Sequence, residues 1–355
     1  MDPRTDDLRI NKSQPLISPA QLSQNLPLPE GTAQFVQQAR QTIENILSGK
    51  DQRVVAIVGP CSVHDPAALM DFAEQFKADT QHLTDAIYPV LRVYFEKPRT
   101  IVGWKGLIND PNLDGTFQIH EGLHLARKVL VDVAQTGLPA ASEFLDTTLG
   151  QFYADLVSFG AIGARTVESQ IHRELASGLS MPVGFKNGTT GAIGVAIDAI
   201  RSASHPHWFP SLTKEGAPAI LHSTGNEHSY LILRGGSDTG PNFEAEYIQK
   251  AAQELESQGL PRSVIVDCSH GNSSKDHRKQ TDVMHCLSGQ IDAGEDAIRG
   301  IMLESHLIAG NQKVVDGVAE TYGQSITDAC LSLKDTLPLL EQMAEVVRFT
   351  TRNRA

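Results

Sequence analysis

Eight short β-rich runs, separated by longer helical stretches, constrain the fold of this chain more than any other feature. The runs are 54–58, 89–95, 139–144, 161–164, 182–185, 230–233, 263–266 and 300–303. Helical patterns between them include 66–78, 123–136, 151–158, 169–177, 191–202 and 245–258. This alternation predicts parallel strands joined by right-handed crossovers. Eight strands fit an α/β fold of the closed (β/α)8, or TIM, barrel type better than an open sheet. A doubly wound sheet stays possible, but no Gly-x-Gly-x-x-Gly motif follows the first strand to indicate a dinucleotide.

Two segments lie outside this alternation. Residues 1–50 form an N-terminal extension in which 32–47 has helical spacing, and residues 51–355 form the predicted barrel. Within the barrel, the connection 205–228 is too long for a simple crossover, and alternating runs flank Lys214-Glu-Gly in a pattern typical of a β-hairpin. Long structured insertions are usually functional or interfacial. We therefore expect the extension and the inserted hairpin to serve regulation or subunit contact.

Charge and composition exclude several classes of protein. The formal net charge of -12 argues against nucleic acid as the main partner, because phosphate-backbone binding requires a basic face. No uncharged run reaches membrane-spanning length, and the first residues lack the pattern of a signal peptide. Four cysteines in 355 residues do not suggest a disulfide scaffold. We therefore expect a cytoplasmic protein with no membrane partner.

Cations gather at the second predicted strand and its exit. Arg92 interrupts an apolar and aromatic run, and Lys97, Arg99 and Lys105 follow within a few residues. Buried Arg and Lys are rare unless paired. This stretch therefore indicates a pocket for an anion such as phosphate or carboxylate. The alternative is that Glu96 and carboxylates of the core neutralise these cations as ordinary ion pairs.

In a barrel the reactive groups stand at the C-terminal ends of the strands. Every predicted strand of this chain ends in a charged, thiol or imidazole side chain, and many of these side chains are cations. The cations expected at one mouth are Arg92, Lys97, Arg165, Lys186 and Arg234. Guanidinium groups together with an ammonium suit a ligand that carries both phosphate and carboxylate. For any single one of them, an ordinary ion pair remains the alternative.

A second set of strand-end residues offers metal ligands. It consists of Cys61, His270, Glu304 and, further along the chain, Asp328. A thiolate, an imidazole and two carboxylates form a mixed donor set for a divalent transition ion such as Mn²⁺, Fe²⁺, Co²⁺ or Zn²⁺, whereas Mg²⁺ avoids the first two. Cys330 lies two residues beyond Asp328, so an approach to Cys61 would make such a site vulnerable to oxidation. Taken singly, a cysteine is more often inert packing and a loop histidine more often a surface residue.

Several motifs together resemble one enzyme family. They are Gly59-Pro-Cys-Ser-Val-His-Asp, Arg92-Val-Tyr-Phe-Glu-Lys-Pro-Arg-Thr, Gly163-Ala-Arg-Thr, Pro182-Val-Gly-Phe-Lys-Asn-Gly, Leu233-Arg-Gly-Gly, Asp267-Cys-Ser-His-Gly-Asn and Ser325-Ile-Thr-Asp-Ala-Cys. The chain resembles the microbial type I 3-deoxy-D-arabino-heptulosonate 7-phosphate (DAHP) synthases over nearly its whole length. The resemblance implies a transferase that condenses phosphoenolpyruvate with erythrose 4-phosphate and water, releases phosphate, and opens the shikimate pathway to the aromatic amino acids.

The resemblance also implies a role for each matched residue. The metal ligands would be Cys61, His270, Glu304 and Asp328. The phosphoenolpyruvate clamp would be Arg92, Arg165, Lys186 and Arg234. Erythrose 4-phosphate would contact Lys97, Arg99 and Thr100, with Lys97 also near the reacting atoms. Glu143 would order a water molecule or a lysine. Lys97, His270 and Cys61 are thus the expected catalytic residues.

Three questions stay open from the sequence. The acceptor could be another sugar phosphate such as arabinose 5-phosphate, or the barrel could bind a phosphometabolite without turnover. An aromatic amino acid effector is expected by resemblance, and Ser211 with residues 6–10 favours phenylalanine over tyrosine or tryptophan. A homodimer or a homotetramer is expected, and the sequence distinguishes neither these two assemblies nor the native metal.

Overall fold

The computed structural model describes residues 5–99 and 101–354, and in it eight parallel strands close into a barrel. The strands are β1 (Val54–Gly59), β2 (Ile87–Arg92), β3 (Ala140–Glu143), β4 (Phe159–Ile162), β5 (Val183–Lys186), β8 (Ser229–Leu233), β9 (Val264–Asp267) and β10 (Ile298–His306). Each strand pairs with the next, and β1 also pairs with β10 in parallel register, Ile57 opposite Met302. The predicted (β/α)8 barrel is confirmed.

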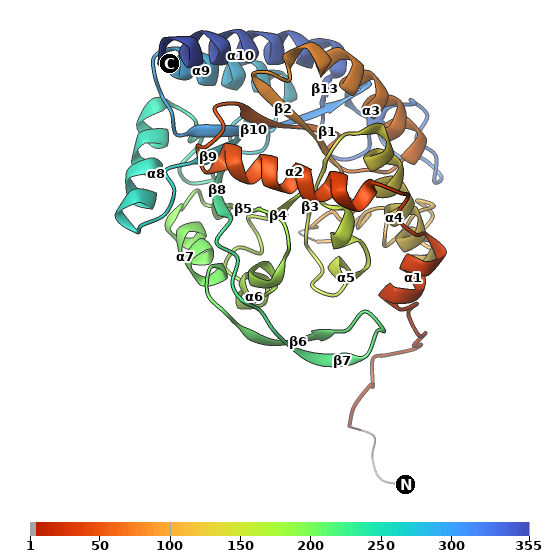
Figure 1. The fold of residues 1–355 in the computed structure, drawn as a ribbon. Coiled ribbons are helices and arrows are strands. Elements are labelled where there is room, and N and C mark those ends of the chain that lie inside the picture. The colour runs from red at the N-terminus through yellow and green to blue at the C-terminus, as the bar shows by residue number, and fades with distance from the viewer. Residues whose placement is uncertain (1–4, 100, 355) are drawn as a thin grey trace.

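Helices cover the outside of the strands, as Figure 1 shows. They are α3 (Pro66–Thr80), α4 (Ile119–Thr136), α5 (Gly150–Tyr153), α6 (Gln170–Gly178), α7 (Gly194–Ala203), α8 (Ala245–Ser257), α9 (Gln280–Asp292) and α10 (Leu333–Arg354). Short 3-10 turns lie at η1 (Gln81–Leu83), η2 (Ala154–Leu156) and η3 (His277–Lys279). Local chemistry sets these ends: Asp65 caps α3 by accepting hydrogen bonds from the N–H groups of Ala67 and Ala68, and Pro66 occupies the first turn.

The N-terminal extension contains two helices, α1 (Pro19–Asn25) and α2 (Thr32–Leu47), and α2 matches the predicted helix. In Figure 1, α2 lies across the strands of the barrel. Ile43, Ile46 and Leu47 of α2 pack with interior residues such as Ile57 and Met302. Part of the extension is therefore part of the barrel's packed core, because these apolar side chains close one end of the barrel interior.

The expected hairpin is present as β6 (Trp208–Leu212) and β7 (Pro218–His222), an antiparallel pair that projects from the barrel in Figure 1. Its turn contacts the extension, since the N–H of Ala20 donates to the carbonyl of Lys214 at 2.6 Å. The Lys214 ammonium donates to the carbonyl of Gln151 at 2.7 Å. The hairpin turn, the extension and α5 therefore meet at one place.

Some predicted boundaries are wrong. The second strand ends at Arg92 rather than at residue 95, and the fourth covers Phe159–Ile162 rather than 161–164. Gly160 has no side chain to extend the apolar pattern, so the start of β4 is not visible in the sequence. The predicted helix 151–158 is only the short α5 followed by η2. The segment after β10 forms three short strands that were not predicted: β11 (Ile308–Asn311), β12 (Gln324–Ser325) and β13 (Leu331–Ser332).

The helices of the described chain include none that is both long enough and apolar enough to cross a membrane.

Candidate active site

A cavity of about 830 Å³ opens where the C-terminal ends of the barrel strands meet. Most of the residues that the sequence singled out line it. They are Cys61, Arg92, Lys97, Arg99, Glu143, Arg165, Lys186, Arg234, His270 and Asp328. Glu304 is buried on β10 and forms an ion pair with Arg92 at 3.2 Å. Thr100 lies outside the described residues. The barrel thus brings together side chains that are up to 267 positions apart in the sequence, as Cys61 and Asp328 are.

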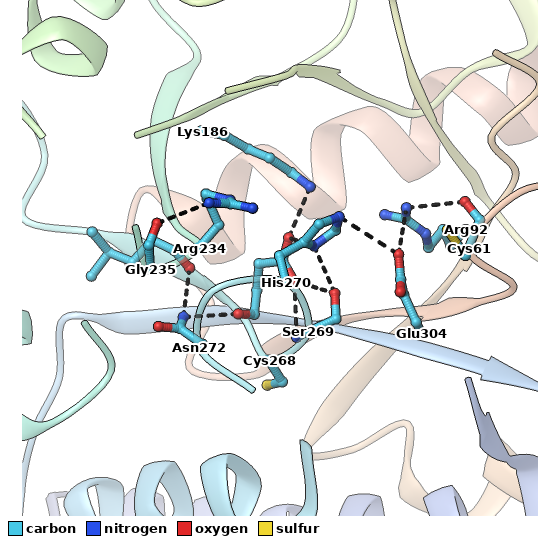
Figure 2. A network of polar contacts seen from close by, with 12 residues as sticks. Cys61, Arg92, Lys186, Arg234, Gly235, Cys268, Ser269, His270, Asn272 and Glu304 are labelled. Carbon is cyan, nitrogen blue, oxygen red and sulfur yellow. Dashed lines mark hydrogen bonds and ion pairs between the residues drawn. The ribbon is translucent and has the colours of Figure 1, made fainter. Parts of the chain in front are cut away.

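Three of the four expected metal ligands form a compact donor group. One ligand atom each from Cys61, Glu304 and Asp328 lies within 4.8 Å of the others. The fourth residue, His270, has its Nε2 3.8 Å from Oε1 of Glu304, which Figure 2 shows as a dashed line. Sulfur, imidazole nitrogen and carboxylate oxygen form a donor set that suits a divalent transition ion.

The Lys97 ammonium supports the view that this donor group attracts a cation. It lies 2.9 Å from the Cys61 sulfur and 2.7 Å from Oδ2 of Asp328. Burial opposes the charge of Lys97, but the Cys61 thiol and Asp328 raise its pKa above the usual value. Burial would also raise the pKa of Asp328, but Lys97 lowers that pKa below its usual range. A positive group therefore already sits against two of the donors, and the residues present fit a bound metal ion.

The backbone and a neighbouring carboxylate orient His270. Its φ of 51° is in the left-handed region, which residues other than glycine rarely adopt and which often marks a functional position. Nδ1 of His270 lies 2.9 Å from Oδ2 of Asp267, so Nε2 is left to face Glu304. Metal-binding histidines commonly have a carboxylate on their other nitrogen. Burial would raise the pKa of Asp267, but His270 and Lys186 hold it well below its usual value.

Two of the predicted clamp cations are deeply buried and paired. Arg92 bonds Glu304 and also donates to the carbonyls of Pro60 and Cys61. The Lys186 ammonium lies 2.8 Å from Oδ2 of Asp267. Figure 2 shows Arg92 and Lys186 within one network of contacts that includes His270 and Glu304. The ion-pair alternative therefore holds for these two cations, and the same carboxylates hold both side chains in place beside the cavity.

Two other cations of the predicted clamp have no carboxylate partner within the described part of the chain. Arg165 is exposed at the rim, where it donates to the carbonyl of Pro98 at 3.5 Å. Arg234 donates to the carbonyl of Gly235 at 3.2 Å. Burial lowers the pKa of Arg234, and the nearby charge of Arg165 adds to this effect although Asp267 opposes it. Two guanidinium groups that repel each other across a cavity form a place for an anion.

Glu143 reaches the cavity from the end of β3. A Cβ atom at Gly163 would lie 2.4 Å from Oε1 of Glu143, so only glycine lets the carboxylate approach the loop after β4 so closely. The Glu143 side chain is buried and lines the same cavity as Lys186. This carboxylate is therefore placed to accept a hydrogen bond from something inside the cavity.

Sequence reasoning missed four residues of this site. No role is predicted for Asp267, which stands at a strand end, and Tyr94 stands within an apolar and aromatic run. Ser274 and Lys275 also line the cavity, and both have a positive φ. The run His270-Gly-Asn-Ser-Ser-Lys contains small polar residues at a strand end, which was the available signal for the last two.

The fold and cavity together define a class of protein first: a (β/α)8 barrel with a group of side chains that could hold a metal ion beside a cluster of cations. Comparison with known proteins narrows this class to a family. The model of the DAHP synthetase I family matches residues 28–341. The chain belongs to this family.

Individual relatives match almost the whole chain. A Phe-sensitive phospho-2-dehydro-3-deoxyheptonate aldolase from Escherichia coli K12 is 52% identical over 348 residues, which are 98% of this chain and 99% of the relative. A tyrosine-inhibited enzyme of the same name from Schizosaccharomyces pombe is 49% identical and covers 98% of this chain and 94% of its own. The solved structure of the aldolase from Francisella tularensis SCHU S4 has a TM-score of 0.92 at 48% identity, covering 96% of this chain and 98% of its own.

Proposed function

We propose that this protein condenses phosphoenolpyruvate with erythrose 4-phosphate and water to give 3-deoxy-D-arabino-heptulosonate 7-phosphate and phosphate. The observation that carries the proposal is the cavity itself: the donors Cys61, His270 and Asp328 line the same space as six predicted substrate-binding cations. Family membership and relatives that bear the name of this activity support it. The protein would thus be a transferase that opens the pathway to the aromatic amino acids.

In this proposal Cys61, His270, Glu304 and Asp328 hold one divalent transition ion. When bound, the ion supplies Lewis-acid polarisation of the aldehyde oxygen of the sugar phosphate. The protein's other side chains orient the metal ligands. Asp267 turns His270 through its Nδ1, and Arg92 holds Glu304 in place.

Phosphoenolpyruvate would lie between the buried cations and the cations near the rim of the cavity. Arg92 and Lys186 are buried, and Arg165 is exposed at the rim with Arg234 close to it. A phosphate carries more charge than a carboxylate and is more costly to dehydrate. We therefore place the phosphate at Arg165 and Arg234, and the carboxylate at Arg92 and Lys186.

The acceptor would bind at the loop after β2. Lys97 and Arg99 line the cavity there, and Arg99 has no carboxylate partner within the described part of the chain. A guanidinium free of other partners suits the phosphate of erythrose 4-phosphate. Thr100, the third residue proposed for this role, lies outside the described residues.

In this reaction the protein's main task is to position the substrates and to stabilise charge, because the attacking atoms belong to phosphoenolpyruvate and water. C3 of phosphoenolpyruvate attacks C1 of the aldehyde and forms the new carbon–carbon bond. The oxygen of a water molecule adds to C2, and the bond from C2 to the phosphate oxygen breaks. Glu143 would accept a proton from that water, and the Lys97 ammonium, which lies against the metal-donor group, would give a proton to the aldehyde oxygen as that oxygen becomes a hydroxyl. Arg165 and Arg234 would stabilise the departing phosphate.

The experiment that tests the proposal measures phosphate release from phosphoenolpyruvate in the presence of Mn²⁺. We expect release with erythrose 4-phosphate and none with arabinose 5-phosphate or without an acceptor. Arg234→Ala should lower kcat/KM at least about a hundredfold, because it removes a charged contact. Arg201→Ala, on the exposed surface of α7, is the matched control and should leave the rate unchanged. Faster turnover with arabinose 5-phosphate would overturn the choice of acceptor. No phosphate release with either sugar would overturn the proposed reaction and favour a barrel that binds a phosphometabolite without turnover.

We also propose that an aromatic amino acid inhibits the enzyme through the extension and the hairpin. The relatives named Phe-sensitive and tyrosine-inhibited support this, and the contact between Ala20 and Lys214 joins the two elements. Residues 5–16 are all exposed, so this arm, which includes Asp6 to Ile10, is available to a second copy in a homodimer or homotetramer. The hairpin residue Ser211 and the arm favour phenylalanine as the effector.

Removing residues 1–17 tests this regulatory role. Helices α1 and α2 remain, so the barrel should fold and turn over normally. Inhibition by phenylalanine should weaken by at least about tenfold, with tyrosine and tryptophan assayed in parallel. Light scattering of both chains gives the oligomeric state. Unchanged inhibition in the shortened chain would remove the arm from the effector site.

A further inference from the structure

Tyr94 carries a buried hydroxyl group to which the proposed reaction gives no role. The residue lies two positions beyond the end of β2, is only 2% exposed and lines the cavity. Its hydroxyl oxygen has no hydrogen-bond partner among residues 5–99 and 101–354. Buried polar groups in native proteins are nearly always paired. An unpaired hydroxyl at the wall of a substrate cavity therefore indicates a partner that arrives with the ligand.

The Tyr94 ring is held rigidly. It packs in the barrel interior with Val90, Ala141 and Phe159. Its backbone carbonyl accepts a hydrogen bond from the N–H of Val63 at 2.9 Å. With ring and backbone both fixed, the hydroxyl has one position relative to the cavity, as a specific substrate contact requires.

The ring of Tyr94 also lies against a cation of the proposed clamp. The central carbon of the Arg92 guanidinium is 3.6 Å from the centroid of the ring. This cation–π contact orients the guanidinium that we assign to the substrate carboxylate. Tyr94 and Arg92 thus line the cavity from adjacent places on the same strand exit.

The surrounding charges keep the hydroxyl protonated. Burial raises the pKa of Tyr94, and although Arg92 opposes this, the carboxylates of Glu143, Asp267 and Glu304 raise the pKa further. The group can then donate a hydrogen bond at any pH at which the protein works. A donor beside a guanidinium matches an anionic oxygen.

We propose that the Tyr94 hydroxyl donates a hydrogen bond to the carboxylate of bound phosphoenolpyruvate, beside Arg92. The inference rests on the proposed function and adds a contact to it. The carboxylate is the partner because Arg92 is buried, whereas the exposed Arg165 marks the phosphate end of the cavity. Tyr94 would then be a catalytic residue that helps to fix the substrate's orientation.

Tyr94→Phe tests this contact, because it removes the hydroxyl and keeps the ring under Arg92. We expect the KM for phosphoenolpyruvate to rise about tenfold or more, the usual effect of losing a hydrogen bond to a charged group, with the KM for erythrose 4-phosphate unchanged. Calorimetry should show the same loss of affinity for phosphoenolpyruvate but none for inorganic phosphate. Comparing two ligands of one variant separates a lost contact from a general loss of folded protein.

Tyr230→Phe is the matched control. Tyr230 belongs to the same interior cluster, but it is not among the described residues that line the cavity, so its variant should bind both ligands as the wild type does. If Tyr94→Phe binds phosphoenolpyruvate as tightly as the wild type, or loses phosphate affinity equally, the contact is overturned while the proposed reaction stands. If the wild type releases no phosphate but Tyr94→Phe selectively loses phosphoenolpyruvate binding, the reaction is overturned and the contact stands.

Discussion

Three cations of the cavity are already paired with carboxylates. Arg92 pairs with Glu304, Lys186 with Asp267, and Lys97 with Asp328. Removing two charges from water is costly, so buried pairs are weak sources of stability. Removing one partner leaves the other charge buried and alone, which is far worse. These pairs therefore serve best to hold charged groups at fixed positions around a substrate.

Lys186→Ala should affect both binding and stability. The KM for phosphoenolpyruvate should rise and kcat should fall, because a charge of the clamp is lost. The free energy of unfolding should fall by about 3 kcal/mol, since the buried Asp267 carboxylate loses its ammonium partner and keeps only the contacts with His270 and Ser269. Steady-state kinetics and urea denaturation measure the two effects.

Lys128→Ala is the control for this variant. It breaks an exposed pair with Asp132 on α4 and should cost less than about 0.5 kcal/mol. Kinetics of Lys186→Ala that match those of the wild type would show that Lys186 is outside the binding site.

Glu96 predicts a pH dependence of stability. The side chain is buried, and burial raises its pKa from 4.5 to about 7, although the N–H of Asp146 opposes this. The charges of Asp146 and Glu143 raise the pKa further, and the neutral Tyr153 packs nearby. The folded protein therefore keeps a proton that the unfolded chain releases between about pH 4.5 and pH 7. Stability is greatest below that window and falls as the pH rises through it, in total by about 3 kcal/mol.

Glu96→Gln should abolish that loss. The variant and the wild type should unfold with similar free energies near pH 5, and the variant should be the more stable at pH 8. Glu256→Gln, on the exposed face of α8, is the control and should follow the wild type. Denaturant melts at pH 5, 6, 7 and 8 measure the difference, and parallel curves for Glu96→Gln and the wild type would contradict the prediction.

At the scale of elements, the loop after β2 carries several of the candidate site residues, and its backbone conformation depends on one glycine. The N–H of Lys97 donates to the carbonyl of Lys105 at 2.8 Å and closes the loop. Gly106 follows with a φ of 112°, and a Cβ there would lie 2.0 Å from the carbonyl oxygen of Phe95. A residue with a side chain cannot take this position without moving the loop. The position of Lys97 thus depends on Gly106.

Gly106→Ala should therefore lower stability by more than about 2 kcal/mol and should raise the KM for erythrose 4-phosphate. Gly289→Ala is the opposite case, because Gly289 lies inside α9 and, apart from the backbone of its own helix and its chain neighbours, no described atom lies within 4 Å of the added Cβ. That change should raise stability by about 0.5–1 kcal/mol without affecting kinetics. Thermal melts and steady-state assays compare the two, and equal effects of both substitutions would rule out a special role for Gly106.

At the scale of the whole molecule, the donor group joins distant parts of the chain. Cys61 follows β1, Glu304 lies on β10, and Asp328 comes from the segment between β12 and β13. β13 pairs with the end of β10, with Ser305 opposite Leu331, which returns the chain to the mouth of the barrel. An ion bound there would link both ends of the barrel sequence. Metal binding should therefore stabilise the fold as well as permit turnover.

Treatment with EDTA should abolish turnover reversibly and lower the thermal midpoint. Mn²⁺ or Co²⁺ should restore both, because sulfur and imidazole donors favour such ions, and Mg²⁺ alone should not. Cys61→Ala should fold but show neither effect of added metal. Restoration by Mg²⁺ alone, or full activity of the stripped protein, would exclude the proposed ligands.

The amino-acid sequence alone is enough to predict the strand–helix alternation. From this alternation follow the barrel and the end of the barrel at which Cys61, Lys186 and His270 stand. These features are readable because apolar periodicity and caps such as Asp65 act over only a few residues. The predicted start of β4 is wrong because Gly160 has no side chain to extend the apolar pattern. Short strands such as β12 and β13 were not predicted because they have too few residues for a pattern.

Which of those side chains meet depends on how the whole barrel packs. The compact grouping of Cys61, Glu304 and Asp328, and the position of Lys97 against two of them, depend on closure of β1 onto β10 and on the return of β13. The unpaired hydroxyl of Tyr94 at the cavity wall is equally invisible in a run of apolar and aromatic residues. The physical reason is that distances between loops are set by the packing of the whole barrel, whereas sequence patterns report only on near neighbours along the chain.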